Sequence, residues 1–365
     1  MNKFVYMDAA ASWLKPQLLI ESQSDFLRNS YANAGRGVCE RAGHVDAMIA
    51  NARRQVADFI GAEPENVVFV SGATDAFNRI VHIIQNTIND KKLTVAVSDL
   101  DHHSARLPWE MSGDDIVVMP LDNDLNICID SIPMADVYVI TAMSNVLGVT
   151  QDVEKIIATI KRKNPDAVTI VDAAQFVVHN KIDVKKINPD FLAFSGHKIG
   201  SDTGVGVMYV KNPDMWNPDK FGGGMVNRVM ENKIVFNKSP EKFESGTLPI
   251  TQTVGVPYAI DYLNSWSGGK DLIKYMYDEL VKLKNIKLLT ARDSVMISFV
   301  PTNMHVLDFG ALIGAHGICV RVGNMCATWI HKKLGVDGSC RISVGPWNTM
   351  EDAMYVVDVI KKLVG

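Results

Sequence analysis

Short runs of strand-forming residues alternate with helix-like segments through the first two thirds of this sequence. Two segments between such runs, 75–88 and 153–163, carry apolar residues at helical spacing. This alternation is typical of a parallel sheet covered by helices, so we predict an α/β fold with a mostly parallel, seven-stranded sheet. The predicted strands are Val67–Val70, Thr94–Val97, Ile116–Met119, Val137–Thr141, Val168–Val171, Phe191–Phe194 and Val205–Val210.

The last third of the chain has a different character. A chain of 365 residues is about twice the usual domain length, which favours two domains. We expect a large α/β domain over residues 21–245 and a small α+β domain that joins 246–365 to 1–20. The segments after Gly246 are a long helix-like region, four short apolar runs and an amphipathic helix: 251–283, 295–300, 306–312, 319–322, 341–344 and 350–363.

Charge and cysteine usage exclude several classes of protein. With 37 basic and 41 acidic residues the net charge is −4, which gives no positive field for nucleic acid or anionic lipid. Five cysteines without a C-x-x-C pair fit a reducing compartment better than a disulfide framework or a zinc site. No long uncharged run indicates a membrane span, and the apolar run 4–7 is too short for a secretory leader. We therefore expect a cytoplasmic protein that binds no membrane, nucleic acid or metal.

Polar side chains follow two neighbouring predicted strands. VTIVDAAQ ends a strand in Asp172, and FLAFSGHK ends the next one in a turn with Ser195, His197 and Lys198. Ligands of open α/β sheets bind beyond the carboxyl ends of the strands, where these side chains meet. A lysine and a carboxylate placed there suit pyridoxal phosphate (PLP), which needs a lysine for covalent attachment and an acid beside its pyridine nitrogen. Taken as residue types alone, two ordinary loop side chains are an equal alternative.

Two further segments suggest how such a cofactor is held. VVFVSGATDAF (67–77) reads as strand, turn and helix, so free amides, the helix dipole and the Thr74 hydroxyl face an anion. Joints of this kind are common, and an ordinary turn remains the alternative. His102 and His103 follow another strand. Because chain neighbours point apart, a ring stacked on an aromatic cofactor is a better interpretation than a metal site, with a plain loop histidine as the alternative.

The order and spacing of ten sequence blocks carry a family resemblance that covers nearly the whole chain. The blocks are YMDAAAS (6–12), SGATD (71–75), DHH followed by PW (101–109), SNVLG (144–148), VDAAQ (171–175), FSGHK (194–198), FGGG (221–224), KFESGT (242–247), RVGNMCA (321–327) and CRISVGPWNT (340–349). The chain resembles fold-type I, class V PLP enzymes, most closely the type II (SufS-like) cysteine desulfurases and selenocysteine lyases. The resemblance implies PLP as the cofactor and a homodimer.

The resemblance also implies roles for the matching residues around the cofactor. Lys198 matches the lysine that binds PLP covalently and moves protons, and Asp172 matches the partner of the pyridine nitrogen. Gln175 matches the residue that hydrogen-bonds the phenolic oxygen, and His102 matches the catalytic ring that stacks on PLP. The remaining implied contacts, around the phosphate, are Ala73, Thr74, Ser195, His197 and Thr247 of the partner subunit.

The implied activity depends on Cys326. Within RVGNMCA it matches the nucleophile of type II desulfurases, while Asn145 and Arg341 match the residues that bind the substrate carboxylate. The resemblance thus implies conversion of L-cysteine, or selenocysteine, to L-alanine with a persulfide on Cys326. An acceptor protein would take the sulfur for iron–sulfur cluster or thio-cofactor assembly. A helix over 326–333 would place Cys326 at its N-terminus, which would favour the thiolate form of this cysteine. By residue type alone, Arg341 suits an ordinary ion pair as well as a carboxylate ligand.

Some positions depart from the family pattern and bear on substrate preference and the sulfur acceptor. Gly35 precedes Arg36 where relatives have histidine, Ala73 replaces a hydroxyl residue, SGTLP (245–249) stands where relatives read T-P-N, and Asn324-Met325 replaces His-His. Rival functions are a cysteine or cystine C–S lyase, a selenocysteine lyase, a kynureninase-like hydrolase, an aminotransferase and a silent PLP-binding subunit. We interpret the other mid-chain cysteines as small buried hydrophobes: Cys39, Cys128 and Cys319.

Overall fold

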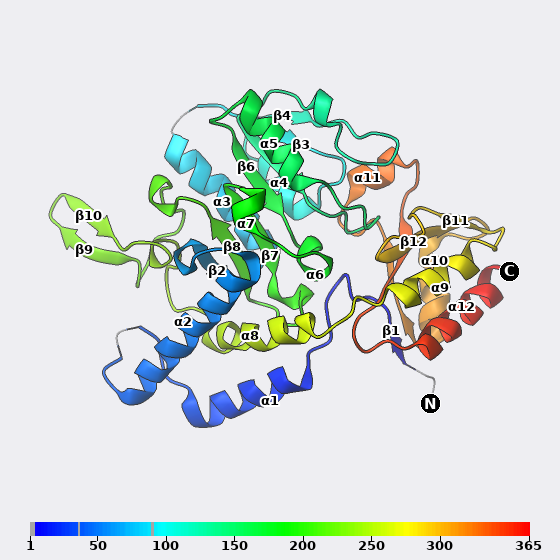
Figure 1. The fold of residues 1–365 in the computed structure, drawn as a ribbon, viewed down its shortest axis with the longest axis horizontal. Coiled ribbons are helices and arrows are strands. Elements are labelled where there is room, and N and C mark those ends of the chain that lie inside the picture. Colours follow the sequence, from blue (N-terminus) through cyan, green and yellow to red (C-terminus); the bar gives the residue numbers. More distant parts are fainter. Residues whose placement is uncertain (1–3, 36, 89–90) are drawn as a thin grey trace.

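The chain folds into two units joined side by side (Figure 1). The computed structural model describes residues 4–35, 37–88 and 91–365. The larger unit is built on a seven-stranded sheet and the smaller one on a four-stranded sheet. Strand β1 (Val5–Tyr6) lies in the smaller unit, where it pairs in parallel with β13 (Ile318–Cys319). Helix α1 (Gln17–Asp25) lies under the larger unit, so residues 5–25 connect the two units.

The larger sheet has the strand order β2-β8-β7-β6-β5-β3-β4. Among its described strands β8 alone runs antiparallel, between β2 and β7. Five strands (β2, β5, β6, β7 and β8) are buried along their whole length, which explains their continuously apolar sequences. The strands are β2 (Val67–Val70), β3 (Thr94–Val97), β4 (Asp115–Val118), β5 (Val137–Thr141), β6 (Val168–Asp172), β7 (Phe191–Ser195) and β8 (Gly206–Val210). The prediction of a mostly parallel sheet is confirmed.

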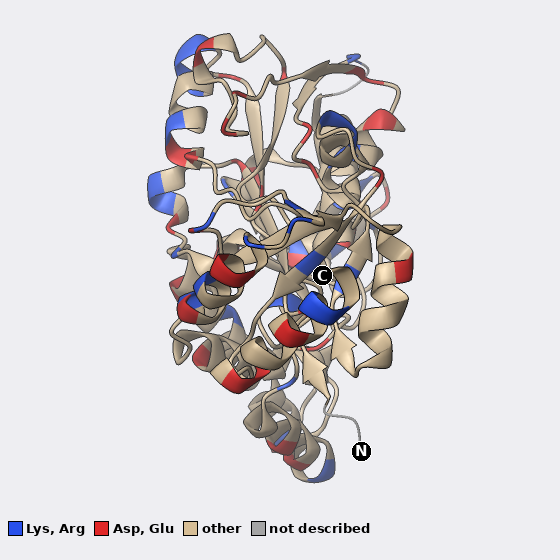
Figure 2. Cartoon of the chain, turned by 90° about the vertical axis from the view of Figure 1, so that its right-hand side faces the viewer, with Lys and Arg blue, Asp and Glu red and all other residues tan. Residues whose placement is uncertain are grey.

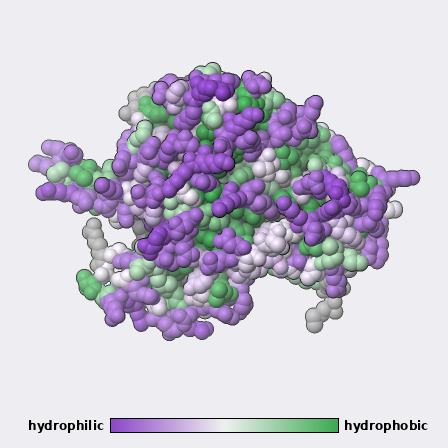
Figure 3. Space-filling view, viewed as in Figure 1, coloured by the Kyte–Doolittle hydropathy of each residue, from purple (hydrophilic) through white to green (hydrophobic). Residues whose placement is uncertain are grey.

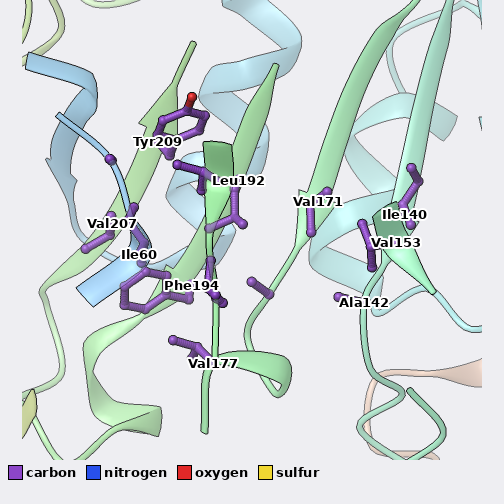
Figure 4. Packing of buried hydrophobic residues seen from close by; sticks show 14 of the residues in the cluster. Ile60, Ile140, Ala142, Val153, Val171, Val177, Leu192, Phe194, Val207 and Tyr209 are labelled. Carbon is purple, nitrogen blue, oxygen red and sulfur yellow. The ribbon is translucent and has the colours of Figure 1, made fainter. Parts of the chain in front are cut away.

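Helices cover both faces of this sheet. One core cluster joins the sheet to α2, α5, α6, α7 and α8, and a second joins its other face to α3 and α4. Figure 4 shows part of the first cluster, with Leu192 and Phe194 of β7 beside Ile60 and Val177. The helices are α2 (Glu40–Ile60), α3 (Ala73–Ile88), α4 (His103–Glu110), α5 (Val153–Lys163), α6 (Phe176–His179), α7 (Val184–Ile187) and α8 (Ile250–Asn264).

The smaller unit has its own core. Its sheet has the order β11-β12-β15-β14, with all neighbours antiparallel. Apolar residues of three helices (α9, α10 and α12) fill the space against this sheet and β1. The elements are α9 (Lys270–Leu280), β11 (Ile286–Leu288), β12 (Met296–Pro301), α10 (Val306–Ala315), β14 (Arg321–Gly323), α11 (Thr328–Lys333), β15 (Ser339–Ser343) and α12 (Met350–Val364).

Most predicted elements after Gly246 are present with changed bounds. The helix-like region 251–283 is two helices, because Gly268 and Gly269 adopt positive φ angles of 96° and 61° between them. The run 306–312 belongs to helix α10. Helix α8 packs on α2 of the larger unit, whereas the elements after it form the smaller unit. The domain bounds at residues 20 and 245 stay a prediction.

The surface is mixed in charge and mostly hydrophilic. Figure 2 shows lysine and arginine interspersed with aspartate and glutamate over the helices on one side, and Figure 3 shows hydrophobic residues gathered mainly near the middle of another face. Among the described helices none has the length and apolarity to cross a bilayer. A hairpin of β9 (Val226–Met230) and β10 (Lys233–Phe236) projects from the larger unit (Figure 1).

Candidate active site

The carboxyl ends of the central strands bring the predicted catalytic groups together. Strand β6 ends at Asp172, which lies in register with Thr141 at the end of β5 and with Ala193 of β7. Strand β7 continues into a single 3₁₀ turn, Gly196–Lys198. Both Asp172 and Lys198 therefore emerge at one edge of the sheet, as the sequence predicts.

A cavity of about 210 Å³ lies at this edge. Its lining includes nine residues proposed for the cofactor or the substrate carboxylate. Four lining residues, Ser104, Thr141, Met143 and Ala174, were missed by the sequence interpretation. The lining residues are Ala73, Thr74, His102, Ser104, Thr141, Met143, Asn145, Asp172, Ala174, Gln175, Ser195, His197 and Lys198.

The turn between β2 and α3 forms one wall of the cavity. The Ser195 hydroxyl accepts a hydrogen bond of 2.8 Å from the Ala73 amide, which ties the start of α3 to the end of β7. Gly206 of β8 makes this close approach possible, since a Cβ there would lie 2.6 Å from the Cα of Gly72. The positive end of the 16-residue helix α3 and the Thr74 side chain thus border the cavity.

Burial shifts the pKa of the charged groups in the cavity. It lowers the pKa of Lys198 to about 7, an effect that the Arg341 guanidinium strengthens and the Asp172 carboxylate opposes. Burial raises the pKa of Asp172 to about 6, against the hydrogen bond from the Ala174 amide and the charge on Lys198. Lys198 therefore gives up its proton more readily than an ordinary lysine, and Asp172 holds a proton more strongly than an ordinary aspartate.

The histidines of the cavity are neutral at pH 7. Burial, with the charge on Lys198, lowers the pKa of His102 to about 4. Burial, with the charges on Lys198 and Lys15, also lowers the pKa of His197 to about 4. The His102 ring caps α4 through its Nδ1, which accepts from the Ser104 amide at 3.2 Å. The ring orientation is thereby set by the start of the helix.

The N-terminal segment contacts two residues of the cavity lining. The carbonyl oxygen of Ala10 accepts hydrogen bonds from Lys198 Nζ at 2.6 Å and from Gln175 Nε2 at 2.7 Å. The sequence interpretation assigned no role to this segment. A contact made by a backbone carbonyl does not depend on residue type, so the sequence gives no direct sign of it. The one indication was that the YMDAAAS block is part of the family resemblance.

The substrate-side residues Asn145 and Arg341 are also adjacent. Arg341 Nη1 donates to the carbonyl oxygen of Asn145 at 2.7 Å, and Nη2 donates to Asp8 Oδ1 at 3.1 Å. The other oxygen of Asp8 accepts from Arg321 Nη2 at 2.5 Å, so one carboxylate joins two arginines. Arg341 is almost fully buried, whereas Arg321 is half exposed. Sequence reasoning missed Asp8.

Cys326 is exposed and lies on a loop outside the cavity lining. Asn145 Nδ2 donates to the carbonyl oxygen of the preceding residue, Met325, at 2.9 Å. The backbone amide of His103 donates to the Cys326 carbonyl oxygen at 2.7 Å. Helix α11 begins at Thr328, two residues after the cysteine, and not at Cys326 as predicted. The loop thus contacts two segments that contribute to the cavity lining.

Several other predictions have different outcomes. Thr247 lies outside the cavity, in a surface groove of about 900 Å³ that Gly222, Gly224 and Arg53 also line. Arg36 lies outside the described residues.

The interpretation of three cysteines as buried hydrophobes was wrong: Cys39 is exposed, and Cys128 and Cys319 are partly buried. Loop and strand-edge positions set this exposure, which residue type does not reveal.

Unpartnered polar atoms show that the cavity fits a polar cofactor. Among the described residues, four buried atoms at or beside it lack a hydrogen-bond partner: Asn145 Oδ1, Gln175 Oε1, His197 Nδ1 and Arg341 Nε. Such atoms are costly to bury unless a ligand or water satisfies them. Their chemistry, with the amine, the carboxylate and the anion-binding turn, matches PLP. Fold and cavity together define a PLP-dependent enzyme of fold type I.

Comparisons with known proteins lead to the same class. The aminotransferase class-V family matches residues 5–356. A cysteine desulfurase of Pectobacterium carotovorum is 30% identical to this chain over an alignment that covers 98% of this chain and 92% of the relative. A cysteine desulfurase of Enterobacter sp. is 32% identical, and the alignment covers 98% of this chain and 93% of the relative. The chain belongs to the aminotransferase class-V family, whose members use PLP.

Solved structures show the same architecture. The apo structure of a cysteine desulfurase from Thermococcus onnurineus superposes with a TM-score of 0.93 at 29% identity, covering 100% of this chain and 95% of that one. The cysteine desulfurase CsdA from Escherichia coli superposes with a TM-score of 0.90 at 29% identity, covering 98% and 94%. Both likenesses extend over the two units.

Proposed function

We propose that this protein is a cysteine desulfurase: it converts L-cysteine to L-alanine and places the sulfur on Cys326 as a persulfide. One observation carries the proposal. An exposed cysteine lies on a loop that is hydrogen-bonded to Asn145, which lines the cavity, and to His103, the neighbour of the cavity residue His102. The relatives named cysteine desulfurase support it, since they match nearly the whole chain.

The cofactor is held by residues from both sides of the cavity. Lys198 would be the attachment point, Asp172 would pair with the pyridine nitrogen, and Gln175 would hydrogen-bond the phenolic oxygen. His102 would stack on the ring. The phosphate would be bound by Ala73, Thr74, Ser195 and His197. When bound, PLP withdraws electrons from the substrate's Cα, which makes the Cα proton removable.

Lys198 and Arg341 act on the substrate directly. The pKa of Lys198, lowered to about 7, leaves a substantial fraction of its Nζ neutral near pH 7, so it can accept the Cα proton and later return it. Arg341 has an unpartnered buried Nε, and Asn145 an unpartnered amide oxygen. A planar guanidinium binds a carboxylate through two hydrogen bonds, so Arg341 holds the substrate carboxylate, with Asn145 beside it.

Cys326 removes the sulfur. Its thiolate attacks the sulfur of cysteine, an S–S bond forms and the substrate C–S bond breaks. The electron pair of that bond stays on carbon, which then takes up a proton. Overall, one thiol and one cysteine give one persulfide and one alanine, so atoms and electrons balance without another oxidant or reductant.

Two partners belong to the proposal. A second copy of the chain would supply Thr247 to the phosphate, since Thr247 lies outside the cavity of its own subunit and is exposed. A sulfur-acceptor protein would meet Cys326 on the surface and pass the sulfur to iron–sulfur cluster or thio-cofactor assembly. A cytoplasmic location remains a prediction from the cysteine usage.

Product analysis tests the function. Purified protein with L-cysteine and a reductant should release alanine and sulfide in a 1:1 ratio. Pyruvate and ammonia as the products would indicate a C–S lyase and refute the proposal. Transfer of the amino group to a keto acid would indicate an aminotransferase.

A further inference from the structure

The loop that carries Cys326 has a backbone conformation that needs outside support. Met325 and Cys326 have consecutive positive φ angles of 51° and 53°. Non-glycine residues adopt this region at a cost of about 1 kcal/mol or more each, and they keep it only where surrounding contacts hold them. The loop must therefore be held by contacts from other elements.

His103 supplies several of these contacts. Its backbone amide donates to the Cys326 carbonyl oxygen at 2.7 Å. Its ring Nε2 lies 2.9 Å from Thr328 Oγ1 and accepts from the Thr328 amide at 3.4 Å. The ring also meets Trp329 edge to face, with centroids 5.2 Å apart. One residue of α4 thus contacts the chain on both sides of Ala327.

The protonation state of His103 suits this role. Burial lowers the pKa of its ring, which favours the neutral form at neutral pH. Because Nε2 accepts from the Thr328 amide, the neutral ring carries its proton on Nδ1. A protonated ring has no acceptor, so the contact with the Thr328 amide requires the neutral form.

Other contacts join α4 and the residues just before it to α11. The Arg106 guanidinium lies 4.1 Å from the centre of the Trp329 ring. Lys333 and Arg106 both lie within 4 Å of the Asp99 carboxylate, just before α4. Ile330 of α11 packs in an apolar cluster with Leu100. The start of α4 and the loop of Cys326 therefore form one connected structure.

We propose that His103 is a positioning residue that holds the Cys326 loop toward the cofactor cavity. Its neighbour His102 lines the cavity while His103 binds the loop, so the pair fixes the nucleophile relative to the cofactor. The kinetic part of this proposal rests on the proposed function, in which Cys326 is the nucleophile. Loss of the His103 ring slows sulfur transfer and leaves earlier cofactor steps unchanged.

The loop itself provides a test that does not depend on activity. In the PLP-loaded protein, His103→Ala should speed amide hydrogen exchange in a peptide spanning 324–329 about tenfold, because ring contacts no longer hold the loop. His103→Gln should restore most of the protection, since its side-chain oxygen can accept from Thr328. The surface variant His44→Ala is the matched control and should leave exchange unchanged. Unaltered exchange in His103→Ala would overturn the proposal, whatever the enzyme's activity.

Kinetics separate positioning from a general structural role. Exchange of the Cα proton of L-alanine with deuterium oxide needs PLP and Lys198 but no thiol, so it should stay at the parental rate in His103→Ala. Single-turnover persulfide formation should fall about tenfold to a hundredfold and recover in His103→Gln. A persulfide rate within twofold of the parent, or an equal fall in Cα exchange, would contradict the proposal. Absence of persulfide in the parent would refute the proposed function, and hydrogen exchange would still decide the role of His103.

Discussion

Arg341 donates a hydrogen bond of 2.7 Å to the backbone carbonyl oxygen of Asn145, across the junction of the two units. Arg341 lies on β15 of the smaller unit, and Asn145 follows β5 of the larger one. Asp8 fixes a second nitrogen of the guanidinium. Two segments that are far from β15 in sequence therefore orient this arginine before substrate arrives.

Replacing this arginine by lysine should weaken substrate binding. Arg341→Lys replaces the planar guanidinium, which Asp8 and Asn145 hold in place, by an ammonium that cannot bind a carboxylate through two parallel hydrogen bonds. The KM for cysteine should therefore rise at least about tenfold. Arg321→Lys is the matched control, because Arg321 is half exposed and keeps its contact with Asp8 as an ammonium. Its KM should change less than threefold. Equal effects of the two substitutions would argue against Arg341 as the carboxylate ligand.

Removing the buried amine should separate cofactor attachment from cofactor binding. Lys198→Ala deletes the only side-chain nitrogen proposed for covalent attachment, so the visible absorbance of the linked cofactor should be lost and turnover should fall at least about 10³-fold. Lys211→Ala serves as the comparison, since this lysine follows β8 away from the cavity lining. Retained turnover in Lys198→Ala, measured as alanine released, would refute the assignment.

The partly buried histidine His197 should make the cofactor-free protein sensitive to acid. Its folded pKa is about 4, below the ordinary 6.5, so the folded state binds fewer protons than the unfolded state between these values. The stability from the neutral ring is therefore complete above pH 6.5 and is lost as the pH falls toward 4. The raised pKa values of Asp101 and Asp172 act in the opposite direction in this range.

Because these effects offset one another, the test compares the parent with His197→Gln. Urea unfolding at pH 7 and pH 5 gives the free energy of unfolding of each. The parent should lose about 1–2 kcal/mol more than the variant between the two pH values. An identical change in both proteins would show that His197 is not buried as a neutral ring.

Cofactor retention should depend on protein concentration. If Thr247 binds the phosphate of the neighbouring subunit, dilution to monomers should release PLP, and Thr247→Val should weaken retention about tenfold. Thr74→Val, which alters a residue lining the cavity of the same subunit, should weaken retention equally at all concentrations. PLP release that is independent of dilution, measured by gel filtration with absorbance, would exclude the intersubunit contact.

The repeating pattern of buried strands was readable from sequence, and so was the position of the cavity. Continuous apolar runs such as 137–141 match a strand buried on both faces, and the polar groups after them emerge at a shared edge. Parallel strands place these groups together by topology alone, which is why Asp172 and Lys198 were predictable neighbours.

Contacts that depend on tertiary placement were not predictable in this way. Ala10 acts through its backbone, and Asp8 meets Arg341 across 333 positions of sequence. The left-handed backbone at Met325 and Cys326 contradicts local residue preference, because contacts from Asn145 and His103 override it. These departures cluster around the proposed site, where function and local propensity conflict most often.

One measurement tests the central claim, the transfer of sulfur from cysteine to Cys326. The PLP-loaded enzyme is mixed with L-cysteine without reductant, and alanine is quantified while peptides are mapped by mass spectrometry. The parent should form one alanine per chain and gain one sulfur atom on the peptide with Cys326. Cys326→Ser should keep the cofactor absorbance and form neither product. Sulfur found on another residue, or alanine formed at the parental rate by Cys326→Ser, would contradict the account.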